Sequence, residues 1–438
     1  MMFKTTLLGI LLLGAFACES SKPANNESPT TPVKPIDKPT QPIVGTSIEP
    51  STNLRAPGDP APLAQASNAL AFDLYKTQRT KKGNLAFSPA SISVAFAMTY
   101  AGANGATAAQ MKKVLHFPED NVLQSSAAGL IASWNSEDTD YELKVVNRLF
   151  GEASYSFEQP FLELTKNTYQ APLENLDFRT NPETQRLHIN DWVLNQTEKR
   201  IADLLPKGSI TGDTRLVLTN AVYFLGKWKR VFDKNDTEKK PFFVNAKEMA
   251  DVPMMHQTEH FGFAEVANAT LLRMPYKGEG LAMTIVLPTA RNGLSKIETD
   301  LDAATYKSWS EQLGKQTQEV NLALPSFEIT NAELPLKDAL TALGMELAFD
   351  RRSADFTKMA NPEGDAERLY ISEAFHKAFV KVDESGTEAA AATAVVMGVK
   401  GGVAAPPRAF IVDHPFLFTI EDTKSGAILF IGRVVDPR

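Results

Sequence analysis

The sequence predicts an α+β fold, because separate stretches carry the periodicities of helices and of strands. Apolar residues between Leu63 and Leu74 recur at helical spacing. Residues 216–228 form a nearly continuous apolar run, which is typical of a central strand covered on both faces. Near the carboxyl end, two apolar runs flank residues 422–426 and predict a β-hairpin. With 438 residues, the chain can bury a substantial core.

The first part of the globular region is predicted to be helical. A second helix starts at Pro89, which suits a first helical position, with Ser88 as its cap. Gly102 and Gly105 are expected to end this helix. The buried stripe of the first helix consists of Leu63, Ala66, Leu70, Ala71 and Leu74.

Later segments alternate between helical and strand-like patterns. Helical spacing is found in residues 190–205 and 336–345, with a helix-to-loop stretch between 287 and 320. Strands are expected where apolar and polar residues alternate, or where several apolar residues follow one another without interruption. The predicted strands are residues 143–149, 216–228, 254–263, 281–287, 320–329, 376–382, 410–420 and 427–435.

Residues 1–17 have the pattern of a signal peptide. Lys4 makes a basic start, residues 7–13 are apolar with one glycine, and small residues precede a cleavage point. The apolar run is too short to stay in a bilayer as a spanning helix. Cys18, the only cysteine, follows directly and resembles the lipidated residue of a bacterial lipobox. We therefore expect a lipid anchor on Cys18, with ordinary signal cleavage and a free thiol as the alternatives.

Residues 18–61 are predicted to form a disordered tether ahead of a globular domain at 62–438. The segment is rich in Pro, Ser, Thr, Asn and Lys and has few aromatic residues, so it cannot bury enough apolar area to offset chain ordering. Such a tether would hold the domain off a membrane. The implied location is the outer membrane or cell surface, or alternatively the periplasm or the medium.

The net charge of −7 argues against a protein that coats nucleic acid. No Lys/Arg cluster forms a polyanion site, because the pair Lys112 and Lys113 is soon followed by Glu119 and Asp120. The sequence therefore predicts no nucleic-acid partner, and it contains no pattern that calls for a cofactor.

The most unusual stretch is residues 384–400. Ser385 and Gly386 break the preceding strand and predict a turn. From Thr387 onward, small residues alternate in a way that would put Thr387, Ala389, Ala391 and Thr393 on one face of a strand. An alanine-rich run often forms a helix, but the turn at its start, the β-branched residues 395–396 and the glycines at 401–402 argue against one. We interpret it as a loop that can become a strand.

These residues resemble the proximal hinge of the serpins, inhibitors that trap serine proteases by inserting a reactive-centre loop into a β-sheet. Segments from residue 84 to residue 437 are similar to serpin segments in the same order, which implies a serpin fold with a large central mixed sheet, smaller sheets and several helices. The loop would span about 384–409. The implied hinge residues are Glu384, Gly386, Thr387, Glu388, Ala389, Ala390, Ala391 and Ala392.

The resemblance also implies two groups of residues that control opening of the sheet. The shutter would consist of Ser88, Ser91, Asn220 and His376. The breach would contain Trp228 and Glu384. Serpins usually have lysine where this chain has Ser326, so Glu384 is expected to lack a cationic partner.

The implied function is inhibition of serine endopeptidases, with cysteine proteases as further targets, by a monomer that is not an enzyme. Counting from the hinge places the bait bond at Lys400-Gly401, which suits a trypsin-like pocket. Met397, Val399 or Val403 would instead suit elastase-like or cysteine proteases. The alternative function is a non-inhibitory serpin that binds a ligand or acts as a chaperone-like surface protein.

Common catalytic motifs are absent from the sequence. His256 and His260 match the H-x-x-E-H zinc pattern, but they lie in a predicted strand, where positions i and i+4 are about 13 Å apart. We therefore predict no metal site. His376 lies in an alternating strand and is expected to be buried and hydrogen-bonded rather than catalytic.

Overall fold

We describe a computed structural model of the chain, which covers residues 57–135, 141–363, 368–387 and 406–438. All of these belong to the second of the two units into which the chain divides, residues 51–438. The predicted signal peptide, Cys18, residues 388–392 of the hinge and the Lys400-Gly401 bond lie outside the described residues.

The described residues contain both helices and strands, so the α+β prediction is confirmed. The helices are α1 Ala61–Gln78, α2 Pro89–Ala101, α3 Gly105–Val114, α4 Asp120–Trp134, α5 Gln159–Tyr169, α6 Pro182–Gln196, α7 Leu294–Asp300, α8 Ala303–Leu313 and α9 Leu336–Ala342, with short 3-10 turns η1 Lys234–Asp236 and η2 Leu347–Phe349.

The strands of the described residues form two sheets. Their bounds are β1 Leu85–Phe87, β2 Tyr141–Glu152, β3 Leu173–Leu176, β4 Leu216–Lys227, β5 Glu238–Phe243, β6 Met249–Val266, β7 Ala269–Pro275, β8 Leu281–Pro288, β9 Thr317–Pro325, β10 Phe327–Pro335, β11 Phe375–Asp383, β12 Gly386–Thr387, β13 Arg408–Ile411, β14 Phe416–Asp422 and β15 Ile428–Val434.

The six-stranded sheet has the order β10-β11-β12-β4-β2-β3, and it is mixed because β2 and β3 run parallel. The nine-stranded sheet has the order β1-β15-β14-β8-β7-β6-β9-β13, with β5 added beside β6. It is also mixed, because β13 runs parallel to β9.

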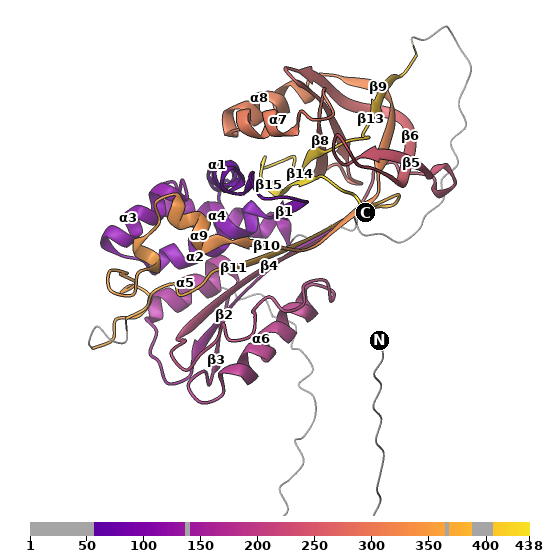
Figure 1. The fold of residues 1–438 in the computed structure, drawn as a ribbon. Coiled ribbons are helices and arrows are strands. Elements are labelled where there is room, and N and C mark those ends of the chain that lie inside the picture. The colour runs from indigo at the N-terminus through magenta and orange to yellow at the C-terminus, as the bar shows by residue number, and fades with distance from the viewer. Residues whose placement is uncertain (1–56, 136–140, 364–367, 388–405) are drawn as a thin grey trace, which may run out of the picture. The chain divides into compact units, whose positions relative to one another are not determined.

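The six-stranded sheet is covered on both faces. Helix α2 contacts β4 on one side, and α6 lies across the other side (Figure 1). The main hydrophobic core includes α2 and the strand residues that face it. Two smaller apolar clusters lie on the α6 side. This burial of both faces explains why residues 216–228 are almost uniformly apolar.

The predicted helical boundaries need two corrections. Helix α6 ends at Gln196 rather than near residue 205, because Glu198, Lys199 and Asp203 adopt positive φ angles that do not continue a helix. Gly102 does cap α2, but Gly105 begins α3 instead of ending α2.

Two of the predicted strands are each divided in the structure. Residues 320–329 span β9 and β10, which separate at Ser326 and enter different sheets. Residues 410–420 span β13 and β14, and the break includes Pro415, which has no N–H for a ladder. An apolar pattern indicates that a segment is buried, but it does not indicate which sheet the strand joins. The sequence therefore did not predict these two breaks.

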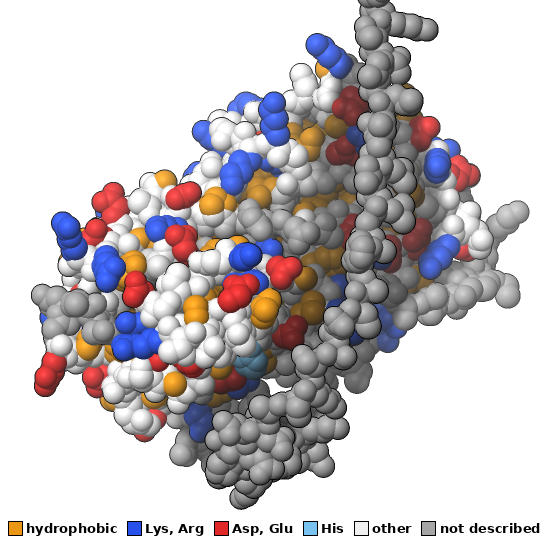
Figure 2. Space-filling view, turned by 60° about the horizontal axis from the view of Figure 1, so that its bottom comes forward, with side chains coloured by type: hydrophobic (Ala, Val, Ile, Leu, Met, Phe, Trp, Pro, Cys, Tyr) orange, Lys and Arg blue, Asp and Glu red, His pale blue; other side chains and the backbone are white. Residues whose placement is uncertain are grey.

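The surface carries charges of both signs. Basic and acidic side chains are interspersed over the face that Figure 2 shows. Among the described residues, none of the helices combines the length and apolar character that spanning a bilayer requires.

Candidate functional site

The candidate site lies where β12 enters the six-stranded sheet. β12 contains only two residues, whereas its neighbours β11 and β4 contain nine and twelve. Thr387 pairs with Val382 of β11 on one side and with Gly226 of β4 on the other. Within the described residues, β12 is the only ladder partner between β11 and β4. The sequence predicted a loop from Ser385 onward, but the chain is already a strand at Gly386.

Two glycines allow β12 to approach β4 closely. A Cβ atom on Gly386 would lie 2.0 Å from the carbonyl oxygen of Gly226, and its φ of +151° is a conformation that side chains rarely adopt. A Cβ on Gly226 would lie 2.3 Å from the ring of Phe224. Glycine is therefore required on both strands for Thr387 to reach its buried position.

Thr387 is 3% exposed and lies against an aromatic cluster. The hydroxyls of Thr387 and Tyr276 share a hydrogen bond of 2.7 Å. The Tyr276 ring stacks on Trp228, with centroids 4.5 Å apart, and meets Phe224 edge to face. Burial raises the pKa of Tyr276 well above its usual value, so its hydroxyl stays neutral. Thr387, the second residue of β12, is thus held in a neutral, hydrogen-bonded pocket.

The chain just before β12 is held by the segment that follows β4. Trp228 donates its backbone N–H to Ser385 O and its indole N–H to Asp383 O, both at 3.0 Å. The Phe232 N–H donates to Glu384 O at 2.8 Å. These bonds fix the turn that directs residues 386–387 into the sheet.

Glu384 is held by a hydroxyl. Thr237 Oγ1 donates to Glu384 Oε1 at 2.8 Å, and no ion pair to Glu384 is present among the described residues. Ser326 donates its backbone N–H to Pro253 O, at the join between β9 and β10. Among the described residues, the side chain of Glu384 is therefore held by a neutral hydroxyl rather than by a cation.

His376 lies near the start of β11 and is 7% exposed. The backbone N–H of Ser88 donates to His376 Nε2 at 3.0 Å, and Ser91 N–H donates to Ser88 Oγ at 3.3 Å. Burial lowers the pKa of His376 to about 4, so the imidazole is neutral at pH 7. Asn220 lies in β4 opposite Asn147 of β2, and its side chain is not among those described.

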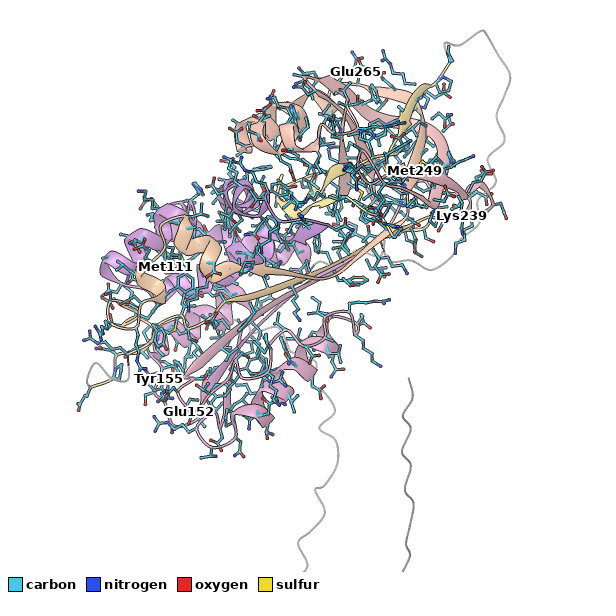
Figure 3. The ribbon with its side chains drawn as sticks, viewed as in Figure 1. Met111, Glu152, Tyr155, Lys239, Met249 and Glu265 are labelled. Atoms are coloured by element: carbon cyan, nitrogen blue, oxygen red, sulfur yellow. The ribbon has the colours of Figure 1, made fainter. Side chains whose placement is uncertain are left out.

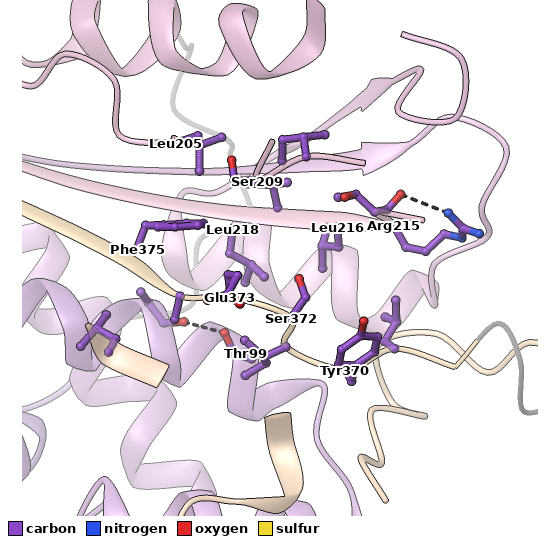
Figure 4. Close-up of a pocket in the computed structure, with 18 of the residues that line it drawn as sticks. Thr99, Leu205, Ser209, Arg215, Leu216, Leu218, Tyr370, Ser372, Glu373 and Phe375 are labelled. Carbon is purple, nitrogen blue, oxygen red and sulfur yellow. Dashed lines mark hydrogen bonds between the residues drawn. The ribbon is translucent and has the colours of Figure 1, made fainter. Parts of the chain in front are cut away.

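A cavity of about 410 Å³ lies farther along the sheet, between the start of β4 and the start of β11. Figure 4 shows Leu216 and Leu218 on β4, Phe375 on β11, and Thr99 on α2 around it. Leu204, Leu205 and Ser209, from the segment after α6, also line the cavity. Most of this lining is apolar, and it includes the first residues of β4 and β11, the two strands that hold β12.

The other end of the loop segment is attached to the nine-stranded sheet. β13 pairs with β9, and Arg408 Nη1 lies 2.8 Å from Glu265 Oε1 near the end of β6. Figure 3 shows Glu265 near one end of the described part and Glu152 and Tyr155 near the other. β12 and β13, the described strands on either side of residues 388–405, thus belong to different sheets.

The structure brings Ser88, Ser91 and His376 together, and it places Trp228 beside the turn that contains Glu384. Sequence reasoning missed Tyr276 and Thr237, which contact Thr387 and Glu384. No local pattern marks either residue, because the Tyr276 contact is made across 111 positions. His256 and His260 lie in β6, and the described residues contain no group of potential metal ligands.

The fold and the site together define a class of α+β protein. In this class, a loop segment of the chain begins a short strand between two longer strands of a sheet. A family model described as "Serpin (serine protease inhibitor)" matches residues 65–437. The chain is 39% identical to human leukocyte elastase inhibitor over 388 residues, covering 86% of this chain and 99% of the relative. The chain belongs to the serpin family.

Further similarities agree with this assignment. An uncharacterized serpin-like protein of Methanosarcina acetivorans is 38% identical over 384 residues, covering 86% of this chain and 88% of that protein. The crystal structure of uncleaved ovalbumin matches with a TM-score of 0.77 and 29% identity, covering 86% of this chain and all of ovalbumin. The resemblance found in the sequence is therefore confirmed at the level of family and fold.

Proposed function

We propose that this serpin inhibits trypsin-like serine endopeptidases by covalent trapping. The observation that carries the proposal is β12, which lies between β11 and β4 although it is only two residues long. Both neighbours extend well beyond it and offer backbone groups to a longer strand. Relatives such as leukocyte elastase inhibitor are named as protease inhibitors.

The proposed reaction begins as an ordinary proteolytic cut. The serine oxygen of the protease attacks the carbonyl carbon of Lys400, and the bond to Gly401 breaks, which leaves an ester between protease and inhibitor. The freed segment then continues β12 into the sheet and carries the protease with it. Distortion of the protease stops hydrolysis of the ester.

The Lys400-Gly401 bond is expected to be the site of cleavage. Incubation with trypsin should give an adduct that survives SDS, and mass spectrometry should show a new amino terminus at Gly401. Lys400→Ala should lower the rate of trypsin inhibition at least about 100-fold, since it removes the charge that a trypsin-like pocket binds. Lys424→Ala, at an exposed turn outside the loop, is the matched control.

Other results would redirect the proposal. A cut only after Met397, Val399 or Val403 would remove the Lys400 assignment in favour of an elastase-like or cysteine protease. Nicking without an adduct, for every protease tried, would favour a non-inhibitory serpin that binds a ligand.

We further propose that the inhibitor is exported and anchored through lipid on Cys18, with residues 19–61 as its tether. The support is the sequence pattern alone, in which an apolar run and small residues precede the single cysteine. Metabolic labelling with a fatty acid should label the wild type and not Cys18→Ser, and the variant should leave the membrane fraction. Equal membrane fractionation of both proteins would refute the anchor and leave a periplasmic or secreted protein.

A further inference from the structure

The four residues that precede α1 are docked on α4. Gly58 donates its backbone N–H to Ser125 O at 3.0 Å. The buried Ser126 hydroxyl donates to Asp59 O at 2.6 Å. We call residues 57–60 the strap. Its backbone is bonded to α4 from both sides of the Gly58-Asp59 peptide, so α4 holds the chain at the start of the folded domain.

A glycine inside α4 allows the strap to lie this close. A Cβ atom on Gly129 would lie 2.2 Å from Gly58 O, and a Cβ on Gly58 would lie 2.8 Å from the Cβ of Ser125. Real Cβ atoms do not come so close, and a side chain at either position would push the strap away. Glycine inside a helix is less favourable than alanine. Thus α4 contains an unfavourable residue at the place where the strap crosses it.

Docking keeps the strap out of a protease active site. A protease binds the chain on both sides of the cleaved bond as an extended strand and pairs with its backbone groups. In the strap, the N–H of Gly58 and the C=O of Asp59 are bonded to α4, and Pro57 and Pro60 have no N–H. Cleavage next to the strap therefore requires that the strap first leaves α4.

The basic residues upstream of the strap follow an unusual pattern. Among the 45 Lys and Arg residues of the chain, only four precede a proline, namely Lys22, Lys34, Lys38 and Lys240. Three of these lie in the predicted tether, residues 18–61. A bond to proline is a poor substrate for a trypsin-like protease, because the ring replaces the N–H and restricts the residue before it. The three tether lysines are therefore poor cleavage sites.

Arg55 is the one basic residue of the tether that no proline follows. Its bond to Ala56 is open to a trypsin-like protease as far as the sequence is concerned. To cut this bond, the protease would also have to bind Pro57 and Gly58 on the far side of it. Gly58 is bonded to Ser125 and lies against α4. The strap thus restrains the chain beside the only basic residue of the tether that proline leaves unprotected.

We propose that the strap, docked on α4, protects the junction between tether and domain from cleavage by trypsin-like proteases. The inference rests on the proposed function and deepens it, because protection of bonds after Lys and Arg identifies the class of protease that the inhibitor meets. The bait residue Lys400 is followed by glycine and lacks this protection. The protease therefore cuts the loop while the domain stays joined to its tether.

The test exposes the protein with its tether to excess trypsin and reads the amino terminus of the folded domain by mass spectrometry. Gly129→Ala displaces the strap, so its cleavage to a new amino terminus at Ala56 should be at least about 10-fold faster than that of the wild type. Ser126→Ala removes one strap bond and should give a smaller increase. Ser133→Ala is the matched control, because the Ser133 hydroxyl donates within α4 to Leu130 O.

Elastase is the comparison protease. The tether contains the bonds Val44-Gly45 and Ile48-Glu49, which follow apolar residues and do not lead into proline. Elastase should therefore release the wild-type domain at least about 10-fold faster than trypsin does. Equal resistance to elastase would overturn the proposal, because the protection would then not depend on Lys and Arg.

The remaining outcomes separate the strap from the proposed function. Rapid release of the wild-type domain by trypsin, with Ala56 as its new amino terminus, would overturn the protection. Equal cleavage rates for Gly129→Ala, Ser126→Ala and Ser133→Ala would overturn the role of the strap. If no protease forms an adduct, the proposed function fails. Slow release of the wild type and fast release of Gly129→Ala would in that case still support the strap.

Discussion

Replacing Thr387 with arginine is expected to convert the inhibitor into a substrate. Thr387 is buried between β11 and β4 and shares a hydrogen bond with Tyr276, so no space or counter-charge is available for a guanidinium. If arginine raises the barrier to insertion by about 3 kcal/mol, insertion slows about 100-fold. Hydrolysis of the ester is then expected to be faster than insertion. Gel analysis with trypsin should then show cut serpin and no SDS-stable adduct.

Thr387→Ser provides the matched control for this prediction. Serine keeps the hydroxyl that meets Tyr276 and removes only a methyl group, so it should form the adduct almost as efficiently as threonine. The arginine variant should still fold, because β12 contributes only two residues to the sheet. Undiminished trapping by Thr387→Arg would contradict insertion of this face of the strand.

The stability of the folded domain is expected to fall as the pH drops below about 6.5, because His376 is buried without charge. Burial lowers the pKa of His376 to about 4, whereas an unfolded histidine titrates near 6.5. The unfolded state therefore binds a proton first, and the stability that His376 contributes above pH 6.5 is lost progressively toward pH 4. The full difference between the folded and unfolded pKa of His376 corresponds to about 3 kcal/mol of stability. About 2 kcal/mol of this is lost by pH 5.

Denaturant unfolding of the wild type and His376→Gln between pH 7 and pH 5 measures this effect. Glutamine can accept the Ser88 N–H bond through its side-chain oxygen but has no proton to gain in this range. The wild type should lose about 2 kcal/mol more than the variant over this interval. Parallel pH profiles for the two proteins would show that His376 is not the group responsible.

Part of the fold was predictable from the sequence, because burial of one face leaves a periodic pattern in neighbouring residues, whereas α3, α4, α5, β3, β5 and β7 were not predicted. The stripe of α1, the cap of α2 at Ser88 and the apolar run of β4 depend on residues close in sequence. The sheet partners of β9 and β10 were not predictable, since a similar apolar pattern serves both sheets. The end of α6 was also missed, because positive φ angles at Glu198 and Lys199 leave no apolar signal.

The candidate site was predictable only in part. Ser385, Gly386 and the small residues that follow mark a turn and a potential strand, and their resemblance to serpins identified the family. The register was not available, since it depends on Thr387 meeting both Val382 and Gly226. Contacts made by Tyr276 and Thr237 were hidden because they join segments more than 100 residues apart.

The sequence by itself determined the family, the α+β class and a loop whose side chains alternate in a way that a strand can use. Tertiary structure alone decided that the strand has already begun at Gly386, between β11 and β4, and that a cavity lies between the starts of these two neighbouring strands. The physical reason is that periodicity records which face of a segment is buried, whereas register and free volume arise only when distant strands and helices pack together.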